Sequence, residues 1–283
     1  MKVMEAFKKG FSVTAGALNL LLTLSVYYIA AAFVRGAIMP KAQPQAWGAS
    51  EWAVALPTGI VFLLLSIFVQ AGIFGYVRDA VKSGRTALSK FPEYGKKFFF
   101  KVLSLWGLIT LIIIVLFSIV TIVSSILIAA MGDAPIADIL GGILFSIGGG
   151  LVIYLTILLF YSPYAIVVDG ASLIQAVKKS AAFVRKNLLK VLGLGMIAVL
   201  FALGVGLLLG FILGIIKVLG ATAIVSNILN TVFVSGINAY LNLVITASFM
   251  ALYLDFNAQA GAWQPGPADV AKKAPSPEGE TGA

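Results

Sequence analysis

Several stretches of more than 20 residues contain no charged side chain, and this feature limits the possible folds more than any other. A helix needs about 20 apolar residues to cross about 30 Å of hydrocarbon. Six segments meet that length: Phe11 to Val34, Ala53 to Tyr76, Val102 to Ala130, Ile136 to Val168, Val191 to Ile216 and Thr222 to Leu254. With 60% hydrophobic and 11% charged residues, the composition excludes a soluble globular domain and a disordered chain. We predict an all-α, polytopic transmembrane bundle of six spans.

Basic residues are distributed unevenly among the segments that connect these spans. Seventeen of the 20 Lys and Arg residues precede the first span, follow the last, or lie between spans two and three or spans four and five. Only Arg35, Lys41 and Lys217 fall on the other side. Because basic loops stay in the cytoplasm, we expect a multi-pass protein of a prokaryotic cytoplasmic (inner) membrane with both termini inside. This placement accounts for the net charge of +9 without a nucleic-acid partner.

The composition divides the chain into two parts. Residues 1–260 contain all six apolar segments and form the expected transmembrane domain. Residues 261–283 are rich in Pro, Gly, Lys, Glu and Ala. Such a segment has too little apolar surface to form a core, so we expect a disordered cytoplasmic tail.

Similar residues recur where the spans meet the cytoplasm. The pairs Lys96-Lys97 and Arg185-Lys186 precede outgoing spans at an offset of 89 residues, and the incoming spans end at Asp79, Asp169 and Asp255. The chain is therefore either three in–out–in hairpins in one orientation, a parallel repeat, or six spans with similar cytoplasmic flanks. The aspartates either oppose a helix dipole or cap the next helix. Asp169 suits the capping role.

The segment from Ala171 to Leu188 has an amphipathic helical pattern. Its apolar residues share one arc, with Phe183 as the exception. Four cations occupy the opposite side: Lys178, Lys179, Arg185 and Lys186. This pattern predicts a helix in the membrane interface whose cations contact anionic lipid headgroups. The alternative is a connecting helix packed on the bundle, and the two interpretations are compatible.

The last span carries four asparagines, which cover one arc of a helical wheel: Asn227, Asn230, Asn238 and Asn242. An unpaired amide in hydrocarbon is costly, so these side chains should face protein or water. They either form hydrogen bonds between helices, with Asn19 and Gln70 as candidate partners, or line a polar substrate cavity.

Small residues recur at four-residue spacing in span five, at Gly206, Gly210 and Gly214. Such stripes let helices approach closely in a bilayer. We expect packing within the chain, with contact in a homo-oligomer as the alternative.

The sequence contains neither cysteine nor histidine. It therefore offers no thiol nucleophile, no Cys/His metal site and no histidine base. No acidic residue lies in the middle of a span, which argues against proton coupling, and no Walker-type loop is present. We expect neither enzymatic activity nor a cofactor or metal.

Three sequence features resemble a known family. They are the stretch SPYAIVVDG at residues 162–170, the following Leu173 to Val177 with Arg185-Lys186-Asn187 before span five, and the ending Leu252-Tyr253-Leu254-Asp255. The chain resembles uncharacterised six-span prokaryotic membrane proteins that are similar to the glycerophosphoryl diester phosphodiesterase membrane domain. The resemblance implies a six-helix bundle with long cytoplasmic connections. It implies no activity, because the catalytic domain has no counterpart here.

The sequence thus predicts a non-enzymatic membrane domain that contacts lipids or scaffolds a partner. That partner would be another membrane protein or a second copy of the chain. The alternative is a transport component, such as a permease subunit or small exporter, that uses the polar face of the sixth span.

Overall fold

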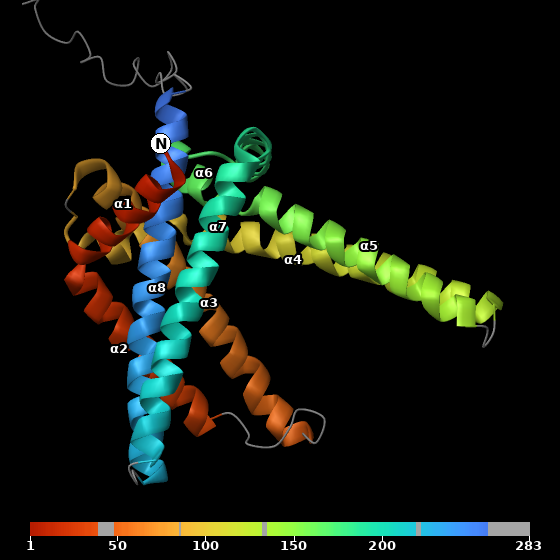
Figure 1. Cartoon of the computed structure of the whole chain (residues 1–283), viewed down its shortest axis with the longest axis horizontal. Helices are drawn as coiled ribbons and strands as arrows, with labels where there is room; N and C mark the ends of the chain where they lie inside the picture. Colours follow the sequence, from red (N-terminus) through yellow and green to blue (C-terminus); the bar gives the residue numbers. More distant parts are fainter. Residues whose placement is uncertain (39–47, 85, 132–134, 219–221, 260–283) are drawn as a thin grey trace, which may run out of the picture.

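The computed structural model describes residues 1–38, 48–84, 86–131, 135–218 and 222–259, and the regular elements within these ranges are all α-helices (Figure 1). They are α1 (Val3–Ala15), α2 (Leu18–Ile38), α3 (Ala49–Ser83), α4 (Lys90–Met131), α5 (Pro135–Leu159), α6 (Ser162–Asp169), α7 (Leu173–Val218) and α8 (Ala223–Gln259). Six helical segments are long and apolar enough to cross a membrane, which confirms the predicted helical bundle. The predicted tail at 261–283 lies outside the described residues.

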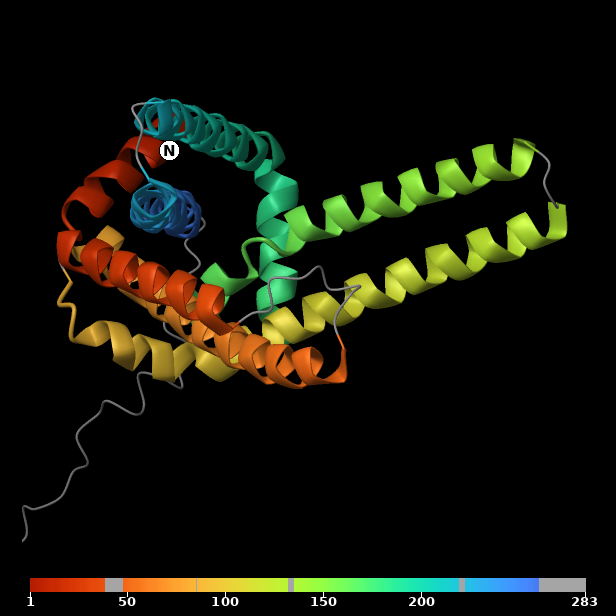
Figure 2. The ribbon, with the colours of Figure 1, turned by 90° about the horizontal axis from the view of Figure 1, so that it is seen from below.

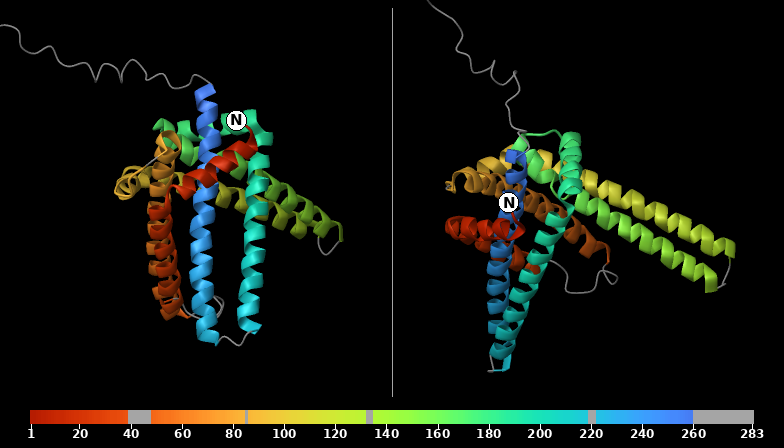
Figure 3. Two further views of the ribbon diagram at one scale, coloured as in Figure 1. Left: turned by 60° about the vertical axis from the view of Figure 1, so that its left-hand side comes forward. Right: turned by 45° about the horizontal axis from the view of Figure 1, so that its top comes forward.

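The long helices form three consecutive hairpins, α2–α3, α4–α5 with α6, and α7–α8. All three start and finish at the same end of the molecule, where the N-terminus lies (Figure 1). We call this the basic end, because the segments with most of the Lys and Arg residues flank the spans on this side. It also carries Asp79, Asp169 and Asp255. The end of α2 and the start of α3, like the end of α7 and the start of α8, lie far from it, as Figure 3 shows.

The helical segment that leads into each hairpin packs on the incoming helix of the hairpin before it. The start of α4 crosses α3, where Gly75 lies against Tyr94. The start of α7 packs on the junction of α5 and α6 through Ser180. The N-terminal α1 crosses α8, where Gly10 lies against Val244 and Ser248. We call each hairpin, together with the helical segment that leads into it, a unit. The three units therefore form a closed cycle, which supports the parallel-repeat interpretation.

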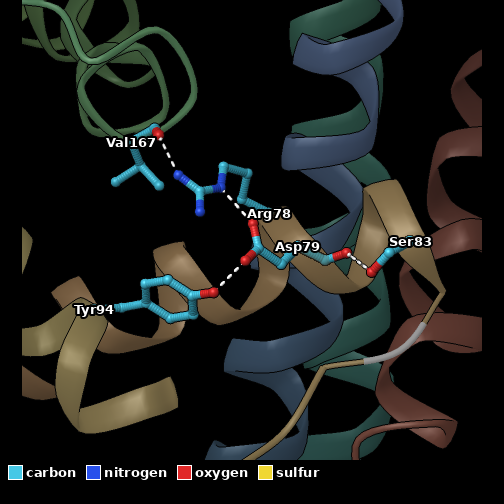
Figure 4. Close-up of polar contacts among 5 residues, drawn as sticks. All are labelled: Arg78, Asp79, Ser83, Tyr94 and Val167. Atoms are coloured by element: carbon cyan, nitrogen blue, oxygen red, sulfur yellow. Dashed lines mark hydrogen bonds and ion pairs between the residues drawn. The ribbon is translucent and has the colours of Figure 1, made fainter. Parts of the chain in front are cut away.

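Polar links at the basic end join the first unit to the second (Figure 4). The Arg78 guanidinium on α3 donates to the Val167 carbonyl of α6 through Nη1, at 2.9 Å. Its Nε donates to Asp79 at 2.6 Å, and Asp79 also accepts from the Tyr94 hydroxyl. The first aspartate thus aligns the arginine that joins two units.

The other two aspartates complete this set of links. Asp169 of the second unit accepts hydrogen bonds from Tyr253 and Asn257 of the third, at 3.0 and 3.1 Å. Asp255 of the third unit forms an ion pair with the amino group of Met1, at 2.6 Å. Each incoming helix therefore carries, at or near its end, a carboxylate that contacts the next unit.

The structure corrects the capping role expected of Asp169. This residue ends α6, and Gly170 follows it in the left-handed conformation, with φ of 66°. Its carboxylate pairs with Lys179 at 2.8 Å instead of capping a helix. The Ser172 amide, just before α7, is bound by the Gln175 side chain at 3.3 Å. A glycine able to adopt positive φ is what lets the chain turn here.

Two helix boundaries also differ from those expected. The first apolar segment is divided at Gly16 and Ala17, so that Phe11 belongs to α1 rather than to the first span. The glycines at 148–150 were a candidate break, yet α5 continues through them, and the chain turns at Phe160 and Tyr161. A side chain from another unit, Ser180, satisfies the backbone at that turn.

Ser180→Ala is expected to lower the free energy of unfolding by about 1–3 kcal/mol, the cost of leaving buried polar groups unsatisfied. The Ser180 hydroxyl donates to the Leu158 carbonyl at 2.6 Å and accepts from the Tyr161 amide at 3.0 Å, and it is fully buried. Thermal unfolding in detergent measures the effect. Ser146→Ala is the control, because this exposed hydroxyl only bonds its own helix. Equal losses in the two variants would contradict this role.

The α4–α5 hairpin extends away from the other long helices in each view (Figures 1, 2 and 3). Within it the two helices approach closely, since a Cβ on Gly148 would come within 2.7 Å of Val120. Many of its large apolar side chains are exposed, as expected for contact with lipid acyl chains. The hairpin therefore lies on one side and α3 and α8 on the other, and we call the region where they diverge the fork.

Candidate intramembrane binding site

A polar cluster within the helical bundle centres on Asn242 of α8. Its amide donates to the Tyr28 hydroxyl of α2 at 2.9 Å and to the Gln70 side-chain oxygen of α3 at 3.5 Å. Thr246, one turn further along α8, donates to the Asn242 oxygen at 3.1 Å. Gln70 was one of two expected partners, whereas the other, Asn19, is exposed on α2. The cluster joins α2, α3 and α8 by hydrogen bonds.

A cavity of about 550 Å³ lies beside this cluster, at the fork between the α4–α5 hairpin and α3 and α8. We call it the inner cavity. Its lining is Tyr28, Gln70, Phe74, Trp106, Ile109, Thr156, Leu159, Phe160, Pro163, Tyr164, Asn238, Leu241, Asn242, Ile245 and Thr246. Trp106 is 45% exposed, so the cavity communicates with the surroundings of the helices. Its volume is within the range of small-molecule sites, about 300–1,000 Å³.

A second cavity, of about 490 Å³, continues along the same face of α8 towards the end opposite the basic end. We call it the outer cavity. It is lined by Tyr27, Tyr28, Ala31, Ala32, Arg35, Phe62, Ser66, Asn230, Thr231, Val234, Ser235 and Asn238. Tyr28 and Asn238 line both cavities. The two cavities therefore adjoin along α8.

The four asparagines have different surroundings. Asn242 is partly buried, hydrogen-bonded and in contact with the inner cavity. Asn230 and Asn238 are exposed and line cavities, and neither amide bonds to another side chain in the described part of the structure. Asn227 is exposed and lines neither cavity. On this face one asparagine therefore joins helices, and two line cavities.

The lining suits an amphiphile. In the inner cavity, as far as the structure describes it, the polar groups are uncharged amides, hydroxyls and the Trp106 indole on a mostly apolar wall. The outer cavity adds one cation, Arg35. An apolar pocket with a few fixed polar groups is the usual form of a ligand site, in which the polar groups orient the ligand.

The four cations expected to contact lipid lie on the first half of α7, before its kink at Asn187, where φ is −125°. All four side chains are exposed: Lys178, Lys179, Arg185 and Lys186. The opposite side of this segment is buried on the bundle. Phe183, the exception to the amphipathic pattern, is buried there and packs against Tyr161 and Tyr253. The segment therefore packs on the bundle and still presents cations outward.

Sequence reasoning missed most of the lining of the two cavities, including Tyr28, Trp106 and Arg35. Tyr28 and Trp106 lie inside apolar segments, where an aromatic residue gives no sign that it faces a cavity. Arg35 was noticed only as a charge on the outer side. The available signal was Gln70, an amide within a span, which the structure places in the lining of the inner cavity.

The model of the family described as "Domain of unknown function (DUF7847)" matches residues 1–260. This range includes the eight helices that the structure describes and both cavities along α8. The comparisons with curated proteins and with solved structures gave no match.

Proposed function

The chain belongs to the DUF7847 family, and we propose that it is a non-enzymatic membrane protein that binds an amphiphilic molecule within the bilayer, as a component of a transport step. The observation that carries the proposal is the pair of adjoining cavities along the asparagine face of α8. They extend from Arg35 and Asn230, near the far end of the helices, to Thr246, nearer the basic end.

The chemistry of the lining indicates the class of ligand. The apolar wall of the inner cavity, which includes Trp106 and Ile109, fits an acyl chain. The amides of Asn238 and Asn242 and the hydroxyl of Tyr28 can bond an uncharged head that carries hydroxyl groups. We therefore propose a neutral amphiphile, such as a glycosylated diacylglycerol, rather than an ion. The divergent α4–α5 hairpin supports entry from the bilayer.

Photolabelling tests this proposal. A monoglycosyl diacylglycerol with a photoreactive acyl chain, mixed with the full chain in neutral detergent, should label peptides around Trp106 and Leu241. Unlabelled glycolipid should compete with the labelling, because the cavity holds a limited number of molecules. Uniform labelling of all exposed helix surfaces, with no competition by unlabelled glycolipid, would contradict the proposal.

A partner-scaffolding role is the second candidate, favoured by the glycine stripe of α7. A Cβ on Gly206, Gly210 or Gly214 would meet nothing within 4 Å in the described structure. The expectation that these glycines pack against another helix of the same chain is therefore wrong for the described residues. Exposed small-residue stripes favour helix association in bilayers. If this face binds a second copy, Gly210→Leu should convert an oligomer into a monomer, as measured by light scattering.

We further propose that the protein resides in a cytoplasmic membrane with the basic end inside, as the placement of basic residues predicts. A reporter active only outside the membrane should give no signal when fused after Asp255 and a strong signal when fused after Gly36. The opposite pattern would overturn this topology. The resemblance to the glycerophosphoryl diester phosphodiesterase membrane domain stays a prediction.

A further inference from the structure

A third cavity, of about 380 Å³, lies at the basic end between the ends of α3, α6 and α8 and the first half of α7. We call it the basic-end cavity. Its charged walls carry Lys82 from α3 and Lys179 and Lys186 from α7, about a hundred residues away along the chain. Its apolar walls include Phe183, Leu254 and Phe256. Cationic side chains from separate helices thus line one cavity together with apolar side chains.

The charge in this cavity is not balanced. The acid in the described lining is Asp169, and it already has three partners: Lys179 at 2.8 Å, Tyr253 at 3.0 Å and Asn257 at 3.1 Å. Asp169 therefore compensates one lysine. Lys82 and Lys186 are exposed and form no ion pair with any described residue. Two ammonium groups are left to attract an anion.

We propose that the basic-end cavity binds the phosphate group of an anionic ligand through Lys82 and Lys186. Lysine binds phosphate as a compact point charge with three donors. The cavity lies at the basic end, where we expect the helices to leave the apolar layer, at the level of lipid headgroups and open to solutes. An anionic phospholipid and a soluble phosphate ester share this chemistry. The site is separate from the two cavities along α8 and does not depend on the ligand proposed for them.

Paired substitutions test the site in the full chain in neutral detergent. Lys82→Gln with Lys186→Gln should weaken binding of phosphatidylglycerol about tenfold or more, since each lysine near a membrane surface contributes about 1 kcal/mol to attraction of anionic lipid. Lys96→Gln with Lys190→Gln removes the same charge from exposed positions on α4 and α7 outside the cavity, so binding should stay close to wild type. Native mass spectrometry measures bound lipid. Equal weakening in both double variants would overturn the proposal.

Glycerol 3-phosphate identifies the source of the phosphate group. If it neither binds nor competes at millimolar concentration, the ligand is the lipid headgroup. If it binds with the same dependence on Lys82 and Lys186, the ligand is a soluble phosphate compound. If the Lys82/Lys186 double variant still binds both phosphatidylglycerol and glycerol 3-phosphate as the wild type does, the proposed site is refuted for both sources of the phosphate group.

Amine modification of the unaltered chain gives a second test that no folding defect can affect. Phosphatidylglycerol should slow acetylation of Lys82 and Lys186 more than that of Lys190, which is exposed on α7 but does not line the cavity. Equal protection of all three lysines would also overturn the proposal.

Discussion

Gly10→Ala is expected to lower the free energy of unfolding by about 1–3 kcal/mol, the usual cost of adding a methyl group to a filled contact. At this position α1 crosses α8 so closely that a Cβ would come within 2.6 Å of the Val244 carbonyl oxygen and would overlap the Ser248 hydroxyl. A backbone carbonyl within a helix cannot rotate away. The two helices must separate, and the contact between the first and third units is weakened.

Gly16→Ala is the matched control, because it makes the same change six residues later. Gly16 is exposed with a helical φ of −77°, and its Cβ would meet only ordinary contacts at 3.6 Å. Alanine loses less backbone entropy than glycine on folding, so this variant should be as stable as the wild type or slightly more stable. Thermal unfolding of both in detergent measures the difference. Equal stability of the two variants would refute the close crossing of α1 and α8.

Asn238→Trp is expected to abolish saturable photolabelling by the glycolipid while the protein remains folded. Asn238 lines both the inner and the outer cavity, and it makes no hydrogen bond with a described side chain that its replacement would break. An indole would occupy space that the ligand needs. Interhelical hydrogen bonds in membranes are worth only about 0.6 kcal/mol on average, so any small change in polar contacts should not unfold the bundle.

Asn227→Trp serves as the control for this substitution. Asn227 is exposed on the same helix three turns earlier but lines neither cavity. Labelling of this variant should match that of the wild type, with the same competition by unlabelled glycolipid. If both tryptophan variants label normally, the asparagine face does not bind the ligand, and only its packing role at Asn242 remains.

The helices and their common orientation could be predicted because they depend on composition along the chain. Each span needs a run of apolar residues, and the flanks of these spans repeat, ending in Asp79, Asp169 and Asp255. The inner cavity could not be predicted, because it depends on the divergence of the α4–α5 hairpin from the other long helices. Apolar side chains that face lipid and those that face protein are the same residue types. The sequence of α4 and α5 therefore does not show which surfaces meet the bundle.

The polar sites show the same division. The asparagines of α8 were noticed because amides are unusual in a span, yet nothing in the sequence separates Asn227, outside the cavities, from Asn238, inside both. Lys82 was counted only as one of many cytoplasmic cations. Its place beside Lys186 in one cavity results from the packing of α3 and α7 on the same two helices, α6 and α8, which brings together residues distant in sequence.

Cysteine protection at position 238 tests the central claim most directly. The chain contains no cysteine, so Asn238→Cys and Asn227→Cys each provide a single reactive thiol. Glycosylated diacylglycerol should slow maleimide modification at 238 in a saturable manner and leave the rate at 227 unchanged. Unchanged rates at both positions, or equal slowing at both, would show that no ligand occupies the cavities along α8.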